Sequence, residues 1–522
     1  MRQNFGASSA TFPDARSGRK WYACFSCLLD SAPPAPVLKA IFDGYNDSEP
    51  MAQQDPEDYP IWGYAPWNQF RDPLAAFVGC TRDEIALVRN ATEANSYIAN
   101  GVDLKPGDEV LMTDQEHPGG EQPWQLKAKR YGIAVKKITL PKPVQNTAQV
   151  LNLFSDAITP RTRVIFFSHI TTVTGVVLPA KELCGLARSK GILSAVDGAH
   201  VPGMMKLNLH DLGCDMYSSS PHKWLQSTKG SGFLYVRDEV IDRLWNTIAT
   251  EGWNEPKLRA ERFQRIGSSN IPALWGLRAS LEFANQIGMD RIEKRHCQQA
   301  DYIHGEMVKR HAESWTSPDP ALRCAIATVN VPPIHIGELE KWMWTKHKIR
   351  IRGGEPYKIR LSTPYYLRRA DMDRFLEKFD EYRKEKKRKE KKRKSTPDAG
   401  MVICGQKDTV TGASGRLQPP SGVIGKPGTE VGRESAINSV PLPARQRGVR
   451  YPNMWQACRD GTKARTRLSA PHSSVVILQP KVRDEFFSAQ VPQSILQLHG
   501  LDEQIVLGIQ AGNCHRRLKI EA

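Results

Sequence analysis

Short apolar runs alternate with helical patterns between residues 71 and 240, and no other feature restricts the possible folds of the chain as strongly. Helical patterns lie at 91–102 and 179–191. Four of the apolar runs have the length and β-branched content of buried strands: 108–113, 132–140, 162–170 and 192–198. This alternation predicts an α/β fold in which helices cover a mostly parallel sheet. Ligands of such sheets bind beyond the carboxyl ends of the strands.

The remainder of the chain divides into segments of different character. Residues 1–27 are expected to form a mobile N-terminal segment, and residues 28–285 comprise the N-terminal segment and large domain. Residues 286–382 indicate a smaller C-terminal α/β domain, whose last helix continues into a basic run at 383–394. Residues 395–522 contain many Gly, Pro and Ser residues with little periodicity, so we expect a disordered tail, although "LDEQIVLGIQ" could be a strand.

The net charge is concentrated in the last quarter of the chain. The formal charge is +17, of which residues 383–394 supply +8 and residues 395–522 supply +6. Residues 1–382 therefore carry only +3, and the charge of the whole chain is not a nucleic-acid footprint of its main domain. The basic run by itself could bind phosphate backbones or direct nuclear import, but we favour a solvated extension of a helix.

The cysteines and the hydropathy bear on the cellular compartment. Ten cysteines are scattered without a framework, as is typical of reduced intracellular thiols. Only Cys24 and Cys27 have metal or redox spacing, and no second pair completes a zinc site. The chain has no apolar run of about 18 residues and no N-terminal signal region, so we expect no membrane span and a cytoplasmic protein. The nucleus is an alternative through the basic run.

A lysine occupies an unusual position in "SSSPHKWLQSTKGSGFLYV", residues 218–236. Lys223 stands between a histidine and a tryptophan, shortly before a glycine-rich turn and an apolar run. Asp197 ends the apolar run "ILSAVDG", and a carboxylate there is costly unless it meets a cation. If the strands before Asp197 and Lys223 are neighbours, both side chains lie in one crevice. From these two residues alone, a structural ion pair is the simpler interpretation.

Further groups around the lysine favour a cofactor site. "NATEAN" opens a helix with Asn90 and Thr92, and helix N-termini bind anions through their backbone N–H groups. "SSSPH" adds hydroxyls and an imidazole just before Lys223. A lysine, a buried carboxylate and an anion site together suit pyridoxal 5'-phosphate, whose aldehyde condenses with the lysine while its ring nitrogen pairs with the carboxylate.

Six motifs spread over residues 28–382 resemble those of the class V aminotransferase family of fold-type I pyridoxal-phosphate enzymes. They are "VRNATEAN", "SHITTVTGVVLPAKEL", "VDGAHVPG", "SSSPHKWLQSTKGSGFLYVR", "RIGSSNIPALWGL" and "IRIRGGEPYKIRLSTPYY". Within the family, the chain is most similar to the isopenicillin N epimerase-like branch, and cysteine desulfurases are more distant. The resemblance implies a large domain with a mostly parallel sheet of the seven-stranded type and a smaller C-terminal α/β domain.

The resemblance also implies the contacts of the cofactor. Lys223 would hold it as a Schiff base and Asp197 would pair with its ring nitrogen; with His117, these are the expected catalytic residues. His117 falls at the start of a loop after a strand, where the family has an aromatic side chain stacked on the cofactor ring. The other expected contacts are His200 and Thr172 near the ring hydroxyl, Thr92, Ser220 and His222 at the phosphate, and Ala91 beside them.

Two further residues are assigned by the resemblance to the substrate and to a second subunit. Arg360 would bind the α-carboxylate of the substrate, for which a bidentate guanidinium is well shaped. Ser268 stands where the family commonly has a threonine that reaches the phosphate of the neighbouring subunit. The resemblance therefore implies a homodimer with shared active sites.

Three features separate the chain from the group II cysteine desulfurases. Those enzymes carry a cysteine on a loop before the arginine strand, whereas "RGGEPYKIRLS" runs directly from Gly354 to Arg360. Cys324 is expected to fill the core, whereas a persulfide carrier needs an exposed thiolate. His200 stands where desulfurases typically have glutamine.

We therefore expect an enzyme that uses pyridoxal phosphate to act on the α-amino group of an amino-acid-like substrate. Lys223 is the natural base for the Cα proton. Epimerase, aminotransferase and lyase chemistry at Cα all remain open, so the enzyme is an isomerase, a transferase or a lyase. The alternatives are a cysteine desulfurase or C–S lyase-like enzyme, a nucleic-acid-binding or nuclear protein that acts through the basic run, and a degenerate pseudoenzyme.

Overall fold

The computed structural model describes residues 23–24, 32–51, 67–354, 356–395, 504–511 and 514–521. The chain forms two compact units, Met1–Gly405 and Gln406–Ala522. The described part of the second unit is an antiparallel hairpin of β14 (Gln504–Ala511) and β15 (Cys514–Glu521). Of residues 395–522, for which we expect disorder, the structure describes Ser395, which ends a helix of the first unit, and this hairpin, whose first strand contains "QIVLGIQ", a segment that the sequence indicated could be a strand.

The first unit contains a seven-stranded sheet of order β2-β8-β7-β6-β5-β3-β4. β8 runs antiparallel to β7 and β2, and the other neighbouring strands are parallel, which confirms the predicted mostly parallel sheet. Its strands are β2 (Ile85–Val88), β3 (Glu109–Thr113), β4 (Ala134–Ile138), β5 (Thr162–Ser168), β6 (Leu193–Asp197), β7 (Met216–Ser219) and β8 (Gly232–Val236). Because β5, β6 and β7 are adjacent and parallel, their carboxyl ends meet at one edge of the sheet.

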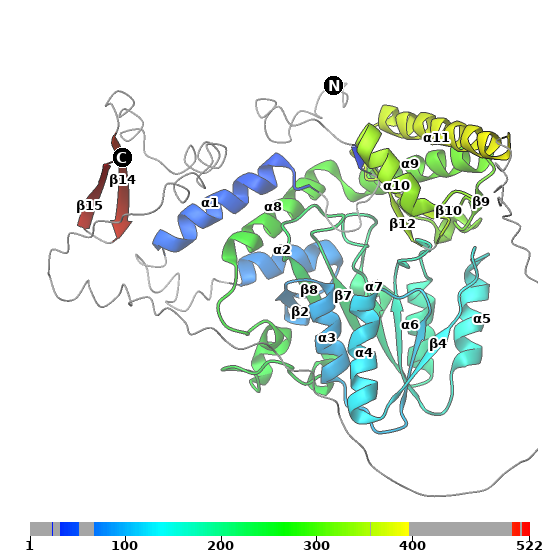
Figure 1. Cartoon of the computed structure of the whole chain (residues 1–522). Coiled ribbons are helices and arrows are strands. Elements are labelled where there is room, and N and C mark those ends of the chain that lie inside the picture. The colour runs from blue at the N-terminus through cyan, green and yellow to red at the C-terminus, as the bar shows by residue number, and fades with distance from the viewer. Residues whose placement is uncertain are drawn as a thin grey trace, which may run out of the picture. The chain divides into compact units, whose positions relative to one another are not determined.

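Helices cover both faces of this sheet (Figure 1). Side chains of successive strand residues point to opposite faces, and so Phe166 and Phe167 of β5 lie in different cores. The core with Phe167 contains residues of α2 (Asn68–Val78), α5 (Thr147–Ala157), α6 (Ala180–Ser189), α7 (Leu209–Leu212) and α8 (Ile271–Ile287). The core with Phe166 contains residues of α3 (Ala91–Gly101), α4 (Pro118–Tyr131), η4 (Asp238–Arg243) and η5 (Pro256–Phe263).

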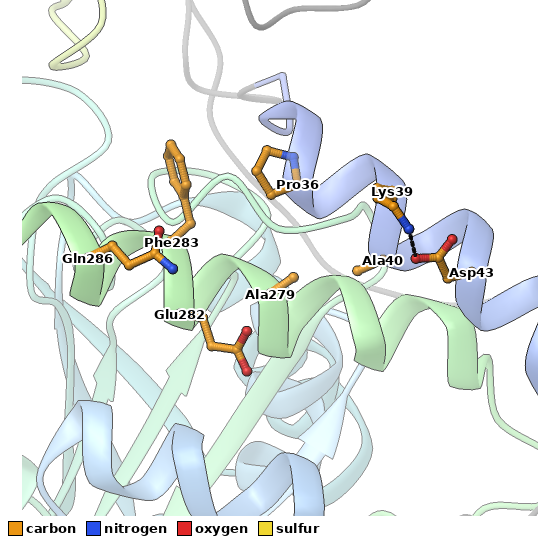
Figure 2. Close-up of a pocket in the computed structure, with 8 residues that line it drawn as sticks. All are labelled: Pro36, Lys39, Ala40, Asp43, Ala279, Glu282, Phe283 and Gln286. Carbon is orange, nitrogen blue, oxygen red and sulfur yellow. Dashed lines mark hydrogen bonds and ion pairs between the residues drawn. The ribbon is translucent and has the colours of Figure 1, made fainter. Parts of the chain in front are cut away.

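Helix α1 (Ala35–Met51) packs against α8, where Gly44 and Gly276 allow a close approach. A Cβ atom at Gly44 would lie 2.9 Å from Trp275, and one at Gly276 would lie 2.7 Å from Ile41. A surface pocket of about 230 Å³ lies between the two helices, and the Lys39–Asp43 ion pair of 2.6 Å borders it (Figure 2). None of the residues expected to bind the cofactor lines this pocket.

A smaller antiparallel sheet of order β12-β13-β10-β9 follows in sequence. Its strands are β9 (Glu313–Ser314), β10 (Ile326–Asn330), β12 (Arg352–Gly354) and β13 (Lys358–Ser362), and the short η6 (Pro320–Leu322) precedes β10. Residues of α9 (Met289–Lys309), α10 (Ile336–His347) and α11 (Arg369–Ser395) form its core. The basic run extends α11, as predicted, and it carries ion pairs such as Lys386–Glu338.

The segment expected to be mobile contributes one short strand. β1 (Ala23–Cys24) pairs in parallel with β11 (Ile349–Arg350), and the mobility expected for residues 1–27 stays a prediction. A two-residue strand leaves no periodicity to detect in the sequence. Cys27 lies outside the described residues. Within the described ranges, no helix is long and apolar enough to cross a membrane, and no cluster of ligating side chains could hold a metal ion.

Candidate active site

Asp197 ends β6 and its carboxylate is buried at the carboxyl edge of the large sheet. Asn95 of α3 donates its side-chain N–H to Asp197 Oδ2 at 2.9 Å, and the backbone N–H of Ala199 donates to Oδ1 at 3.0 Å. Ser218 of β7 in turn donates its hydroxyl to Asn95 Oδ1 at 2.7 Å. The carboxylate is therefore held by two donors, and one of them is itself fixed by the neighbouring strand.

Lys223 follows β7 by four residues, and its amine is near enough to Asp197 for that carboxylate to raise its pKa, so the two strand ends bring these residues to the same edge of the sheet. Its Nζ lies 3.5 Å from His200 Nε2. The side chain keeps some accessible surface, but desolvation by the surrounding protein lowers the pKa of the amine to about 8. Asp197 opposes this shift of the pKa, whereas Arg360 and Arg352 add to it. An amine with this pKa is partly neutral, and hence nucleophilic, near neutral pH.

His200 is buried beside the lysine. Its Nδ1 accepts a hydrogen bond of 3.0 Å from the indole N–H of Trp224. Burial, followed by the nearby charge of Lys223, holds the pKa of the imidazole well below its usual range. His200 is thus a neutral ring whose Nε2 faces the lysine amine.

The N-termini of α3 and α4 lie next to each other at this edge of the sheet. The backbone N–H of Ala91 in the first turn of α3 donates to Ser220 Oγ at 2.9 Å, which brings Ser220 to the helix N-terminus. Thr92 is exposed there, and a Cβ atom at Gly119 of α4 would lie only 2.3 Å from Thr92 Oγ1. Two neighbouring helix N-termini offer backbone N–H groups and the positive ends of two helix dipoles, which suit a phosphate.

Two histidines lie close to these helix N-termini. His117 is the N-cap of α4, and its Nδ1 accepts the backbone N–H of Gly119 at 2.9 Å. A helix rather than a loop therefore begins after His117, because Pro118 fits the first helical position and His117 caps the next turn. The ring of His117 is exposed and lies near enough to Lys223 and Asp197 for their charges to shift its pKa, so it could stack on a planar ligand bound there. His222 directs its Nδ1 at Ser231 O, 3.0 Å away.

Arg360 reaches the crevice from β13 of the smaller sheet. Its guanidinium is buried, and one Nη1–H group donates to the backbone oxygen of Thr172, in the loop after β5. The Nε and Nη2 atoms have no hydrogen-bond partner among the described residues. Burial, with a contribution from Arg352, lowers the pKa of Arg360 to about 9. Thr172 thus contacts the site through its main chain. The remaining N–H groups of Arg360, which have no partner among the described residues, suit a carboxylate ligand.

Ser268 is the one expected site residue that the described chain does not bring to the crevice. It lies exposed in the loop between η5 and α8, and it makes no hydrogen bond to the other site residues. Its expected role concerns a neighbouring subunit and stays a prediction.

Cys324 is buried just before β10 and donates its S–H to Gly175 O at 3.1 Å. Burial raises the pKa of the thiol to about 12. Only three residues separate β12 from β13, so the connection is as short as the sequence indicated. A buried, protonated thiol fits the expected core role and does not suit a persulfide carrier.

Sequence reasoning missed four residues that shape the site. Asn95 holds Asp197, and Trp224 holds His200. Gly120 allows a close approach, because a Cβ atom at this position would lie 3.0 Å from Asp197 Oδ2. Glu116 accepts hydrogen bonds of 2.5 Å from both Thr113 and Ser168, and burial raises its pKa to about 7. The doubled glycine after His117 was a detectable signal, whereas the other three residues have partners far away in sequence.

These residues fit pyridoxal phosphate on the structure's own terms. The crevice combines a partly neutral lysine, a firmly held carboxylate, two helix N-termini and a guanidinium with two buried N–H groups that lack partners. The aldehyde, the ring nitrogen and the phosphate of the cofactor would each find a group of the required chemistry, and the guanidinium would be left for a substrate carboxylate.

Comparisons with known proteins find a family model and curated relatives that match the chain. The family model described as aminotransferase class-V matches residues 30–373. The isopenicillin N epimerase of Streptomyces clavuligerus is 30% identical over 331 residues, which cover 60% of this chain and 83% of that protein. The isopenicillin N epimerase of Amycolatopsis lactamdurans is 29% identical over 380 residues, covering 68% of this chain and 95% of that protein.

The fold is likewise similar to that of a solved structure. The apo structure of a cysteine desulfurase from Thermococcus onnurineus NA1 superposes with a TM-score of 0.62 and 22% identity, covering 69% of this chain and 94% of that one. At this identity, the likeness concerns the fold alone.

Proposed function

Since this chain belongs to the aminotransferase class-V family and is a pyridoxal-phosphate enzyme, we propose that it binds an amino-acid-like substrate by its α-carboxylate and changes a bond at Cα. Lys223 would carry the cofactor, Asp197 would meet its ring nitrogen, and the N-termini of α3 and α4 would hold its phosphate. When bound, the cofactor withdraws electrons from Cα of a substrate amine and so weakens the bonds to that atom.

The observation that carries the substrate proposal is the guanidinium of Arg360. An arginine with two buried N–H groups and no partner for them is costly in a folded protein. A carboxylate that accepts both N–H groups removes that cost and orients the substrate by two parallel hydrogen bonds. The amine of Lys223, whose pKa both Arg360 and Arg352 depress, lies in the same crevice. The α-amino group of a substrate held by Arg360 would therefore face the lysine end of the site.

Lys223 is also the group best placed to move a proton at Cα. When its Nζ is not bonded to another group, a pKa of about 8 lets the amine both accept and return a proton near neutral pH. The neutral imidazole of His200 3.5 Å away does not compete for that proton, because its own pKa is far lower.

Epimerase, aminotransferase and lyase chemistry all begin from this arrangement. The burial of Cys324 and the short β12–β13 connection argue against a desulfurase that uses a carrier cysteine. A lyase that releases sulfur without such a cysteine would share the site, and the reaction products distinguish it from the other candidates.

The test uses the full chain loaded with pyridoxal phosphate. A panel of L- and D-amino acids is added, and the absorption of the bound cofactor, the exchange of the Cα proton with D₂O, and the release of keto acid or sulfide are followed. We expect at least one amino acid to change the cofactor spectrum and to exchange its Cα proton, and we expect Arg360→Leu to abolish both effects while it still binds the cofactor. A loaded enzyme that responds to no α-amino acid would contradict the proposal.

We also propose that the enzyme is a homodimer whose second copy covers the region around Ser268. Trp245, Ile248 and Trp253 expose 56%, 41% and 41% of their surface near this loop. Thr250 Oγ1 bonds Arg265 O at 2.7 Å, which ties the apolar segment to the loop. Analytical ultracentrifugation should find a dimer that Trp253→Asp weakens; a monomeric wild-type protein would contradict this proposal.

Two assignments made from the sequence continue as proposals. We propose that residues 28–285 and 286–382 form the large and the small domain, which places the seven-stranded and four-stranded sheets in different domains. A cytosolic location is supported by five cysteines that form no disulfide: Cys80, Cys184, Cys214, Cys297 and Cys324. Fluorescence imaging of a tagged full-length protein tests the location.

A further inference from the structure

We propose that Trp224 is a positioning residue that fixes the tautomer of His200, so that His200 offers an N–H group, rather than a lone pair, to the atoms bound beside Lys223. The inference rests on the proposed function insofar as Lys223 carries the cofactor. It adds a role for the residue that follows the lysine in sequence and that touches neither cofactor nor substrate.

The hydrogen bond between the two rings determines which nitrogen carries the proton. The indole N–H of Trp224 can only donate, and it lies 3.0 Å from His200 Nδ1. His200 Nδ1 must therefore accept with its lone pair. Burial, with the nearby charge of Lys223, lowers the pKa of the imidazole and keeps the ring neutral, so its single proton resides on Nε2, and the Lys223 amine in its neutral form can accept from that N–H.

The protonated nitrogen faces the active site. His200 Nε2 lies 3.5 Å from Lys223 Nζ, on the side of the ring opposite to Trp224. Without the indole N–H, a neutral imidazole could also place its proton on Nδ1 and turn a lone pair toward the lysine. A glutamine side chain, which the desulfurases typically have at this position, has an amide donor whatever lies behind it. A histidine needs a partner such as Trp224 to become a donor of fixed direction.

The surroundings hold Trp224 in the position that this role requires. Its ring packs edge-on against His296, with centroids 5.2 Å apart and an interplanar angle of 78°. His296 is buried and is anchored by a hydrogen bond of 2.9 Å between its Nδ1 and the backbone oxygen of Met204. Trp224 itself exposes only 3% of its surface and packs in a cluster with Val201 and Cys324. The indole therefore cannot rotate away from His200 without disrupting this cluster.

The first test measures the tautomer in the cofactor-free, full-length protein. Histidine labelled with ¹⁵N is incorporated, and the ring nitrogens are observed by NMR; His200→Gln identifies the signals of His200. We expect a single tautomer protonated at Nε2 in the wild type, and a shift of population toward Nδ1–H in Trp224→Phe. Nδ1–H as the main form in the wild type, or an unchanged tautomer in Trp224→Phe, would overturn the proposal.

A matched control separates the lost N–H from the lost indole volume. Trp124 is another fully buried tryptophan, but its indole N–H has no hydrogen-bond partner among the described residues. Trp124→Phe should therefore leave the signals of His200 unchanged. If Trp224→Phe does not fold, a tryptophan analogue with sulfur in place of the ring N–H keeps the shape of the side chain and removes only the donor.

The second test is a double-mutant cycle on the affinity for pyridoxal phosphate. Removing one hydrogen bond of about 1 kcal/mol weakens binding about fivefold, and we expect Trp224→Phe to do so in the wild-type background. In the His200→Gln background, the same substitution should have no further effect. Equal losses in both backgrounds would show that Trp224 acts by packing and would overturn the proposal. If the wild type binds no cofactor, the proposed function fails, whereas the NMR result stands independently.

Discussion

Asn95 Nδ2 lies 2.9 Å from Asp197 Oδ2, and this contact joins the N-terminal half of α3 to the carboxyl end of β6 across 102 residues of sequence. Ser218 Oγ donates to Asn95 Oδ1 at 2.7 Å, so the amide is oriented from behind. The carboxylate that we assign to the cofactor ring is thus held in place by a side chain that touches neither lysine nor substrate.

The substitution Asn95→Ala should therefore weaken both folding and cofactor binding. It leaves a buried carboxylate oxygen and the Ser218 hydroxyl without these partners, which lowers the free energy of unfolding by about 1–3 kcal/mol. It also lowers the affinity for pyridoxal phosphate, because Asp197 is then free to move. Asn146 provides a control, since it caps α5 through a 2.9 Å bond to the Gln149 N–H. Asn146→Ala should cost about 1 kcal/mol of stability and leave the affinity unchanged. Thermal melts and spectral titrations measure the two effects, and equal affinities in both variants would refute the role of Asn95.

Arg360→Leu should separate stability from substrate binding. Two N–H groups of the guanidinium already lack partners, so its replacement should change the free energy of unfolding by less than about 1 kcal/mol. Two charge-assisted hydrogen bonds to a carboxylate are worth about 3 kcal/mol, and substrate binding should weaken about 100-fold.

Arg71 is the matched buried arginine, with a 2.7 Å ion pair to Glu261 and a 3.0 Å bond to Ile85 O. Arg71→Leu should lose about 3–5 kcal/mol of stability, because it leaves the backbone oxygens of Ile85 and Arg82 without the guanidinium and leaves Glu261 paired with Arg265 alone. If Arg360→Leu proved as destabilising as Arg71→Leu, Arg360 would be structural rather than a substrate ligand.

The capture of pyridoxal phosphate by the cofactor-free protein should depend on the protonation of Lys223. Burial lowers the pKa of this amine to about 8, and only the neutral form attacks an aldehyde. The rate of capture should therefore rise as pH increases toward 8 and level off above it. Stopped-flow absorbance between pH 6 and 10 gives the profile. A rate that continues to rise toward the pKa of an exposed lysine, about 10.4, would mean that the reacting amine is not the buried one.

Glu116 should make the stability of the protein depend on pH. Burial raises its pKa to about 7 in the folded state, above the value of about 4.3 expected in the unfolded chain. The stabilisation from its bound proton is fully present below pH 4 and is lost as pH rises through 7.

Glu116→Gln lacks this titration. The free energy of unfolding of the variant, relative to that of the wild type, should therefore rise between pH 5 and pH 8 by up to about 3 kcal/mol. Thermal melts at the two pH values measure the gain. A constant difference between the two proteins would show that Glu116 does not titrate in this range.

The fold and the centre of the site were predictable because they depend on patterns that are local in sequence. The runs that became β3, β5 and β6 are mostly apolar, which indicates strands buried on both faces, whereas the edge strand β4 carries two lysines and is only partly buried. Asp197 and Lys223 were placed together because each follows a strand, and those strands proved to be parallel neighbours.

The supporting contacts were not predictable, because each joins residues that are distant in sequence. Asn95 gives no signal of its contact with Asp197, and Arg360 reaches the Thr172 carbonyl across 188 residues. Trp224 follows the lysine directly, yet its N–H contacts a ring that belongs to the loop after β6. The resemblance to a family supplied roles for residues that touch the cofactor, whereas the groups behind them emerged only from the packing.

The most direct measurement locates the cofactor on the chain. The full-length protein is loaded with pyridoxal phosphate, treated with borohydride to make the attachment permanent, and digested for mass spectrometry. Lys127 is the matched control, because it is also buried, with a lowered pKa, but donates to Val102 O away from the crevice. We predict a phosphopyridoxyl group on Lys223 that persists in Lys127→Ala and is absent from Lys223→Ala. A modification spread over surface lysines, or one that survives the loss of Lys223, would contradict the account.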